Sequence, residues 1–288
     1  SITKLIERKF PDNLVISNQF IRHGIISPKF KIYKTNVNGQ NWGLMIAEEQ
    51  FSNVFLENRK LKDGLIFKLT NEASSKISIN LKKQNIKPRN VFISKQDKVN
   101  IDIFNKKKIN KYKYLQDQET LIKSIREKLN TSISDEEKYT LIKKYFDIDK
   151  LAKLLANVTV FNTFHSLNRL NLRFYLNPYN LVIEPIPTDN YYKLASTDKN
   201  NFKKELGDLN VIFLILYKDE NFRNTFKAAL LEIQSNLKKI KQDSVHLCEK
   251  FEDYCSDIIN FKNMENHIVN LISIGPNIFP QNNLEKKK

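Results

Sequence analysis

The sequence predicts an α+β fold in which a strand-rich N-terminal part precedes a mainly helical C-terminal part. Hairpin signals are concentrated before Leu69, and helical periodicity dominates after Gln116. A chain of 288 residues with 41% apolar content is long enough to bury a full hydrophobic core. We therefore expect a strand-rich lobe over residues 1–115 and a mainly helical lobe over residues 116–288.

The strands of the first part are indicated by apolar residues on both sides of a turn signal. Residues 30–37 and 42–46 flank Asn38-Gly39, a dipeptide that favours a two-residue hairpin turn. Residues 49–58 then carry apolar side chains at helical spacing. This part is expected to contain a hairpin followed by a short helix.

A further strand is expected over residues 64–69. Successive side chains of a strand point to opposite faces. Ile66 and Lys68 would therefore face one side, and Leu65 and Phe67 the other.

The second part shows helix signals interrupted by two apolar strands. Ser134 and Glu137 have the spacing of a capping box, and Asp149 is a candidate cap for the next helix. Helices are expected over residues 116–129, 134–146, 149–164 and, after the strands, from 208 to about 272.

The two cysteines, Cys248 and Cys255, are seven residues apart in a segment expected to be helical. Helical rise would separate them by ~10 Å, which is too far for a disulfide. The sequence has no Cys or His spacing typical of a zinc site.

No run of ~18 apolar residues exists, and the first ten residues lack the apolar segment of a secretory signal. We expect a soluble protein without a membrane span, and a cytoplasmic location is weakly favoured. Ser1 is not an initiator methionine, so a missing N-terminal segment would leave the compartment open.

The formal net charge of +16 predicts anionic partners. Residues 105–114 are the most concentrated basic segment, with five lysines and two tyrosines that could contact a phosphate backbone and stack on bases. A lysine run in a loop is more often a solvated surface. Nucleic acid is therefore kept as a less favoured partner.

Residues 165–189 hold the strongest functional signal. Asn171 and Arg173 stand at the start of an apolar strand, and Asp189 follows the next strand. The two ends of a short hairpin meet, so the oxygens of Asn171 and Asp189 could bind one hard cation. The alternative is a hairpin with polar ends and no metal.

This segment resembles the C-terminal motif of the CotH-type (spore coat protein H) kinase-like family, H-x-L-x-x-N-x-R-F-Y-x-N-P followed by L-E-P-I-x-x-D. The upstream segments V-N-G-Q-N-W-G-L-M-I-A-E-E and D-G-L-I-F-K resemble further elements of that family, in the same order. The matching residues of the C-terminal motif are His165, Leu167, Asn171, Arg173, Phe174, Tyr175, Asn177, Pro178, Glu184, Pro185, Ile186 and Asp189.

The resemblance implies a protein-kinase-like two-lobed fold, with the motif hairpin in the helical lobe. It also implies that ATP binds with Mg²⁺ or Mn²⁺, where a strand lysine held by a glutamate contacts the phosphates. Lys68 is the candidate lysine and Glu49 its candidate partner, with Glu48 and Glu72 as alternatives. Arg173 would bind a phosphate or pair with Glu184.

The catalytic loop departs from the kinase pattern. In protein kinases the catalytic Asp stands five residues before the metal-binding Asn, a position that falls on Ser166 if Asn171 is that Asn. His165 and Asn168 are the remaining candidates near it, with Asp189 completing the site. His165 could accept the acceptor's proton or orient the acceptor, or it could be a hydrogen bonder that only pins the loop.

Three functions stay open. The first is a CotH-like kinase that transfers phosphate from ATP to a protein or small-molecule hydroxyl. The second is a catalytically inactive nucleotide-binding pseudokinase, and the third is a basic nucleic-acid-binding protein. Steep salt dependence of DNA or RNA affinity would favour the third.

Overall fold

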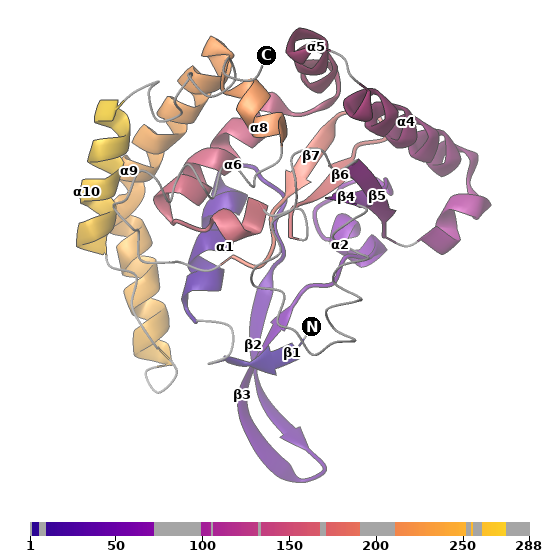
Figure 1. The fold of residues 1–288 in the computed structure, drawn as a ribbon. Coiled ribbons are helices and arrows are strands. Elements are labelled where there is room, and N and C mark those ends of the chain that lie inside the picture. The colour runs from indigo at the N-terminus through magenta and orange to yellow at the C-terminus, as the bar shows by residue number, and fades with distance from the viewer. Residues whose placement is uncertain are drawn as a thin grey trace, which may run out of the picture.

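The computed structural model is a mixed α+β fold, as the sequence predicts (Figure 1). It describes residues 2–5, 10–71, 99–104, 106–131, 134–167, 171–190, 211–251, 255 and 261–274. The strands are β1 (Ile2–Lys4), β2 (Phe30–Val37), β3 (Gln40–Glu48), β4 (Ile66–Asn71), β5 (Val99–Ile103), β6 (Arg173–Leu176) and β7 (Ile183–Ile186). The helices are α1 (Asp12–Arg22), α2 (Asn53–Glu57), α4 (Lys113–Asn130), α5 (Asp135–Tyr145), α6 (Ile148–Val160), α8 (Val211–Leu216), α9 (Glu220–Lys250) and α10 (Phe261–Ile274), with short 3-10 helices η2 (Lys106–Lys111) and η3 (Phe164–Leu167).

The first sheet has three antiparallel strands in the order β1-β3-β2. Its long hairpin turns at Asn38 and Gly39, which have φ angles of 50° and 78°. Positive φ at both central residues is the mark of the turn that matches strand twist, so the expected hairpin is confirmed. One side of this sheet packs on a small core around Leu5, Phe10 and Ile46.

The second sheet has four strands in the order β5-β4-β6-β7, all antiparallel. Ile66 pairs with Tyr175 and Phe67 with Phe174, so the motif hairpin lies against a strand from the N-terminal part. The sheet therefore crosses the expected boundary between residues 115 and 116. The division into two lobes remains a prediction.

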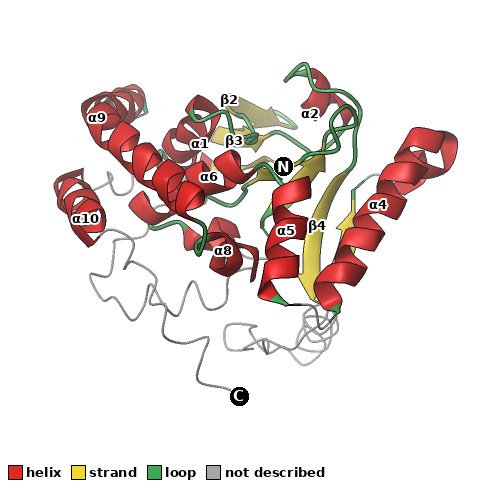
Figure 2. Ribbon diagram, turned by 90° about the horizontal axis from the view of Figure 1, so that it is seen from above, coloured by secondary structure: helices red, strands yellow, loops and turns green. Residues whose placement is uncertain are grey.

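The two faces of this sheet meet different surroundings, as the alternation in residues 64–69 predicts. Leu65, Phe67 and Leu69 enter the large core beneath the helices, whereas Ile66 joins a smaller cluster beside α2. Figure 2 shows α4 and α5 beside β4. The helical face is thus filled by the large core, and the α2 face packs against the smaller cluster.

The helices begin close to their expected positions. Ser134 and Glu137 form the predicted capping box of α5. The expected cap of α6 is wrong by two residues, because the side chain of Asp147, and not that of Asp149, accepts the hydrogen bond from the backbone N–H of Lys150. Asp149 lies in the first turn of α6 instead.

The expectation that Cys248 and Cys255 are too far apart to pair is wrong. They form a disulfide, with Cα atoms 5.7 Å apart. The helix that was expected to hold both cysteines ends at Lys250, so Cys255 lies beyond it and is free to fold back. Cys255 and Phe251 pack against the core beneath the first sheet, so the disulfide lies where the end of α9 reaches that sheet.

Glycine is required at position 64 because the backbone of β6 approaches it closely. A Cβ atom at this position would lie 2.3 Å from the carbonyl oxygen of Leu176 and 2.8 Å from the Tyr175 ring. We therefore expect Gly64→Ala to destabilise the protein by about 2–3 kcal/mol, because β4 and β6 would have to separate. Chemical denaturation measures this change. Gly24→Ala is the comparison, because it meets no atom within 4 Å and only its φ of 73° opposes the side chain. An equal or larger loss for Gly24→Ala would contradict the explanation.

Within the described ranges, no helix has both the length and the apolar character needed to cross a membrane.

Candidate functional site

A pocket of about 330 Å³ opens where the ends of several strands meet on the α2 side of the second sheet. This volume lies in the range of roughly 300–1,000 Å³ that is typical of ligand pockets. We call it the Arg173 pocket. Its lining residues are Glu48, Glu49, Gln50, Phe51, Phe104, Asn171, Arg173, Thr188 and Asp189.

Three of the predicted site residues are brought together by the motif hairpin. The Nε2 atom of His165 lies 2.8 Å from Oδ2 of Asp189, and the Nδ2 of Asn171 donates to the carbonyl oxygen of His165 at 3.0 Å. Asn171 and Asp189 both line the pocket. The two ends of the hairpin therefore converge, as expected from their positions in the sequence.

Asp189 occupies a sharp turn three residues after the end of β7. Its φ angle is 58°, a left-handed conformation that is uncommon for residues other than glycine. Aspartate tolerates this conformation better than most residues, because its short polar side chain hydrogen-bonds locally. The turn directs the chain so that the carboxylate faces His165. Local strain of this kind is concentrated at functional sites in proteins.

Arg173 is held in the pocket by two aromatic rings. Its Cζ atom lies 4.6 Å from the ring centroid of Phe51 and 5.2 Å from that of Phe104. Nη1 donates to the carbonyl oxygen of Asn171 at 3.0 Å and to the hydroxyl of Thr188. The guanidinium is thus fixed in position before any ligand arrives.

The guanidinium retains donors that the described protein does not use. Its Nε is buried and has no hydrogen-bond partner among the described residues. Burial lowers the pKa of Arg173, and the nearby carboxylates of Glu48, Asp189 and Asp102 oppose this shift. An arginine remains charged in proteins. The pocket therefore contains a partly desolvated cation, which would attract an anionic ligand.

Glu184 is not the partner of Arg173, although the sequence left that pairing open. The strand register places Glu184 opposite Tyr175 and places Arg173 opposite Ile186. Glu184 instead forms a short ion pair with Lys150 of α6.

The expected ion pair between Lys68 and Glu49 is wrong. Nζ of Lys68 lies 3.4 Å from Oδ2 of Asp102, the residue directly opposite on β5. Glu49 is held by Arg59, whose Nη2 lies 2.6 Å from Oε2. Burial raises the pKa of Glu49, but hydrogen bonds from Arg59, Asn58 and the backbone of Lys29 outweigh burial and lower it. Lys68 therefore pairs with its cross-strand neighbour Asp102, and Glu49 pairs with the guanidinium of Arg59.

Lys68 nevertheless lies close to the site. It is on the same sheet face as Ile66, which pairs with Tyr175, and Tyr175 shares its face with Arg173. Its Nζ is 6.0 Å from the centroid of Phe104, the ring that also contacts Arg173. Lys68 does not line the Arg173 pocket.

Two expected residues cannot be placed. Asn168, a catalytic candidate, and Glu72, an alternative partner of Lys68, lie outside the described residues. Glu48, the other alternative, lines the Arg173 pocket.

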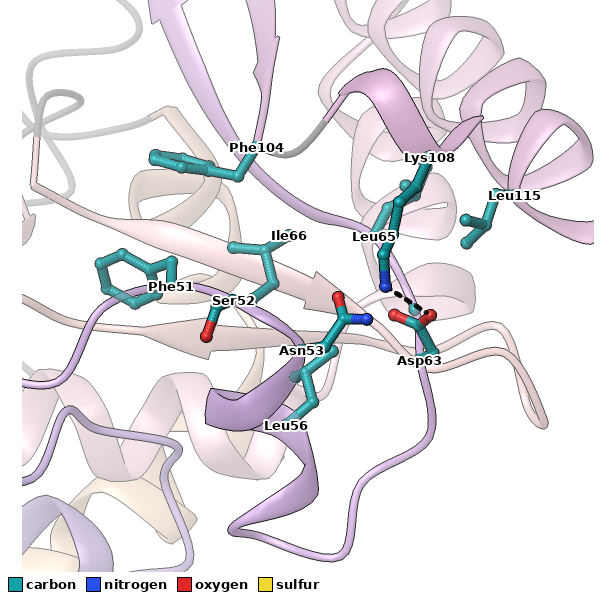
Figure 3. A pocket seen from close by; sticks show the side chains of 11 residues that line it. Phe51, Ser52, Asn53, Leu56, Asp63, Leu65, Ile66, Phe104, Lys108 and Leu115 are labelled. Atoms are coloured by element: carbon teal, nitrogen blue, oxygen red, sulfur yellow. Dashed lines mark hydrogen bonds and ion pairs between the residues drawn. The ribbon is translucent and has the colours of Figure 1, made fainter. Parts of the chain in front are cut away.

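A second pocket beside α2 and β4 is too small for a nucleotide (Figure 3). Its volume of about 20 Å³ is room for roughly one water molecule. It shares Phe51 and Phe104 with the Arg173 pocket, and Lys108 and Asp63 form an ion pair at 3.3 Å on its other side. Size therefore favours the Arg173 pocket as the ligand site.

The basic segment around η2 is partly neutralised. Lys108 pairs with Asp63, and Lys113 pairs with Asp117 at 2.6 Å. Lys106, Lys107 and Lys111 are exposed. Nucleic-acid binding by this segment stays a prediction.

Sequence reasoning missed four pocket residues, Gln50, Phe51, Phe104 and Thr188. Thr188 is next to Asp189 and accepts from Arg173, so its place in the motif was an available signal. Phe51 and Phe104 come from segments that are far apart in the chain, and no local pattern indicates that they would enclose one guanidinium.

The described residues contain no group of three or more His, Cys, Asp or Glu side chains that could hold a metal ion. This does not conflict with a nucleotide-linked metal, because Mg²⁺ is often bound by one or two protein carboxylates together with phosphates and water. The donor set of Asn171 and Asp189 suits such an ion.

Comparison with known families gives one result that covers most of the chain. No curated protein sequence matches the chain. The family model described as CotH kinase protein matches residues 7–273. The chain therefore belongs to the CotH kinase family.

Proposed function

We propose that this protein is a kinase that binds ATP with Mg²⁺ or Mn²⁺ in the Arg173 pocket and transfers phosphate to a hydroxyl of a protein or small molecule. Membership of the CotH kinase family suggests a kinase-like function. The observation that carries the proposal is the convergence of Arg173, Asn171 and Asp189 on one ligand-sized pocket.

Arg173 would bind the phosphates of the nucleotide. Its charge, its planar fork of donors and its fixed position between two rings are what a phosphate site needs. Rigid donors lose little entropy when the ligand binds. Lys68, on the same face of the sheet, would add positive charge to the region.

Asn171 and Asp189 would hold the metal ion. A bound Mg²⁺ or Mn²⁺ would neutralise phosphate charge as it develops. His165 contacts both residues: its carbonyl oxygen accepts from Asn171, which does not need the His165 side chain, and its ring lies beside the Asp189 carboxylate. Glu49 is occupied by Arg59 and would shape the wall of the pocket without contacting the nucleotide.

The acceptor hydroxyl would lose its proton to a group beside the pocket. Ser166, at the position of the kinase catalytic Asp, is buried, and its hydroxyl donates to the carbonyl oxygen of Thr163 at 2.7 Å. Ser166 therefore cannot face an acceptor. His165 and Asp189 are the described groups that could receive this proton, and phosphoryl transfer through a loose transition state requires only weak base assistance.

A thermal-shift screen of ATP, GTP and ADP with Mg²⁺ or Mn²⁺ tests binding. A nucleotide at 100 times its Kd should stabilise the folded state by ~2.7 kcal/mol. Transfer of labelled γ-phosphate to the protein itself or to added acceptors tests the reaction. Absence of any nucleotide-dependent shift would contradict the proposal.

The inactive nucleotide-binding alternative also has a specific observation in its favour. The position of the catalytic Asp is a buried Ser166 that is already hydrogen-bonded. Metal-dependent nucleotide stabilisation without transfer to any acceptor would favour a pseudokinase over an active kinase.

Substitution of His165 distinguishes nucleotide binding from phosphate transfer. We expect His165→Ala to leave the Kd for ATP within about threefold and to lower the transfer rate by about 100-fold, as expected for loss of a proton acceptor or of its orientation. Single-turnover kinetics and a nucleotide titration measure the two effects. His246→Ala, at an exposed histidine on α9, is the matched control. Parallel losses of binding and transfer would show that His165 only supports the fold of the pocket.

A further inference from the structure

The β2–β3 hairpin, Phe30–Glu48, projects from the body of the molecule (Figure 1), and we call it the arm. Its base packs on Leu5 and Phe10. The residues of its tip, from Asn38 to Trp42, are exposed. Among the described residues the arm packs only through its base, so its outer part provides surface for something other than that core.

The outer edge of β2 is open in the described part of the chain. The strand order is β1-β3-β2, so β3 covers one edge of β2 and no described strand covers the other. An open edge presents backbone N–H and C=O groups at the spacing of an extended peptide. Such edges bind partner segments by adding them as a further strand.

The charge of the arm indicates the charge of its partner. Lys31 and Lys34 are exposed on β2. No Asp or Glu occurs between Asn13 and Ala47, so the arm has no acid of its own above its base. A second copy of this arm would place lysine beside lysine, and like charges on paired strands are destabilising. The complementary occupant is an acidic segment.

The distribution of the lysines favours a polypeptide over a nucleic acid. Residues three apart on a strand face opposite sides, so Lys31 and Lys34 stand on the two faces of β2. Side chains of an added strand also alternate between these faces. Single-stranded nucleic acid instead requires aromatic rings and cations gathered along one groove. Only Lys31 shares its face of β2 with the exposed ring of Tyr33, and Lys34 stands on the other face.

The base of the arm also adjoins the Arg173 pocket. Phe30, the first residue of β2, pairs with Glu48, which lines the Arg173 pocket. Tyr33 and Trp42 are each 49% exposed on the arm, so apolar contact surface accompanies the charges. A segment bound along β2 would therefore have one end near that pocket.

We propose that the arm binds an acidic polypeptide segment in extended conformation, added as a strand to the outer edge of β2. Lys31 and Lys34 pair with its carboxylates, and its backbone pairs with that of β2. The inference rests on the arm alone. Combined with the proposed kinase function, it makes the acceptor an acidic polypeptide.

Trp42 supplies the measurement, because it is the only tryptophan of the chain. The probe is a synthetic peptide that repeats Glu-Glu-Val-Val, so that glutamates lie on both faces of the added strand. It is titrated while tryptophan emission is recorded. We expect a saturable change in emission. The double variant Lys31→Glu, Lys34→Glu should weaken binding by about tenfold or more, because each pairing becomes a repulsion.

Controls make the outcome decisive. Lys238→Glu with Lys239→Glu changes the net charge equally on the exposed side of α9 and should leave binding unchanged. The same peptide N-methylated at alternate residues, on its pairing edge, should bind at least tenfold more weakly, since it cannot donate hydrogen bonds to β2. Equal binding of the methylated peptide, equal loss in the α9 variant, or tighter binding of single-stranded oligothymidine at the same lysines would overturn the proposal. The result does not depend on nucleotide binding or transfer.

Discussion

Replacing Asp189 by alanine is expected to abolish the metal-dependent stabilisation of the protein by ATP while leaving the unliganded protein folded. Asp189 lines the Arg173 pocket and is the carboxylate that the hairpin places beside Asn171. A divalent cation that loses its only proposed carboxylate ligand loses most of its binding energy at this site. At an ATP concentration 100 times the wild-type Kd, the expected loss is the full ~2.7 kcal/mol of ligand stabilisation. Thermal shifts with and without Mg²⁺ measure it.

A graded series tests the assignment of the metal ligands. Asn171→Ala should weaken metal-dependent binding less than Asp189→Ala, because a neutral amide contributes less to a divalent site than a carboxylate does. Asp117→Ala removes an exposed carboxylate on α4 and is the matched control. If ATP still stabilises the Asp189 variant in a metal-dependent way, the metal is bound elsewhere and the proposed site is wrong.

Local patterns predicted those parts of the fold that depend on neighbouring residues. The turn at Asn38 and Gly39 follows from the preference of that dipeptide for positive φ. The two faces of β4 follow from strand alternation. The capping box of α5 requires only Ser134 and Glu137, three residues apart. In each case the determining contacts lie within a few residues.

Interaction partners that are far apart in the sequence could not be predicted from local patterns. Glu49 pairs with Arg59 rather than Lys68 because the segment after β3 folds against α2, which the sequence does not indicate. The disulfide was missed because it depends on where α9 ends. Several carboxylates and cations could satisfy each expected pairing, so only the three-dimensional arrangement selects one.

The candidate site was predicted in part for the same physical reason. Asn171 and Asp189 converge because a short hairpin must bring its two ends together. The enclosure of Arg173 by Phe51 and Phe104 joins segments that precede and follow residues 72–98, and no pattern within either segment signals it.

Arg173→Met is expected to weaken ATP binding by about 100-fold, since truncating one partner of a desolvated charge pair typically costs about 2–5 kcal/mol. Arg173→Lys should weaken it by about tenfold, because lysine keeps the charge but cannot reproduce the planar fork or stack between Phe51 and Phe104. Calorimetric titration of ATP with Mg²⁺ measures both affinities.

The stability of the same variants shows whether Arg173 serves the ligand or the fold. Arg173→Met removes two hydrogen bonds, to Asn171 and Thr188, but it also removes a buried charge and a buried Nε that has no described partner. Burial of that charge disfavours the folded state, as the lowered pKa of Arg173 indicates. These contributions have opposite signs, so the free energy of unfolding of the unliganded protein should change by less than about 1 kcal/mol. A loss of several kcal/mol with unchanged ATP affinity would instead make Arg173 a structural residue of the motif hairpin. A loss of affinity at nearly constant stability means that the protein keeps this buried cation for its ligand.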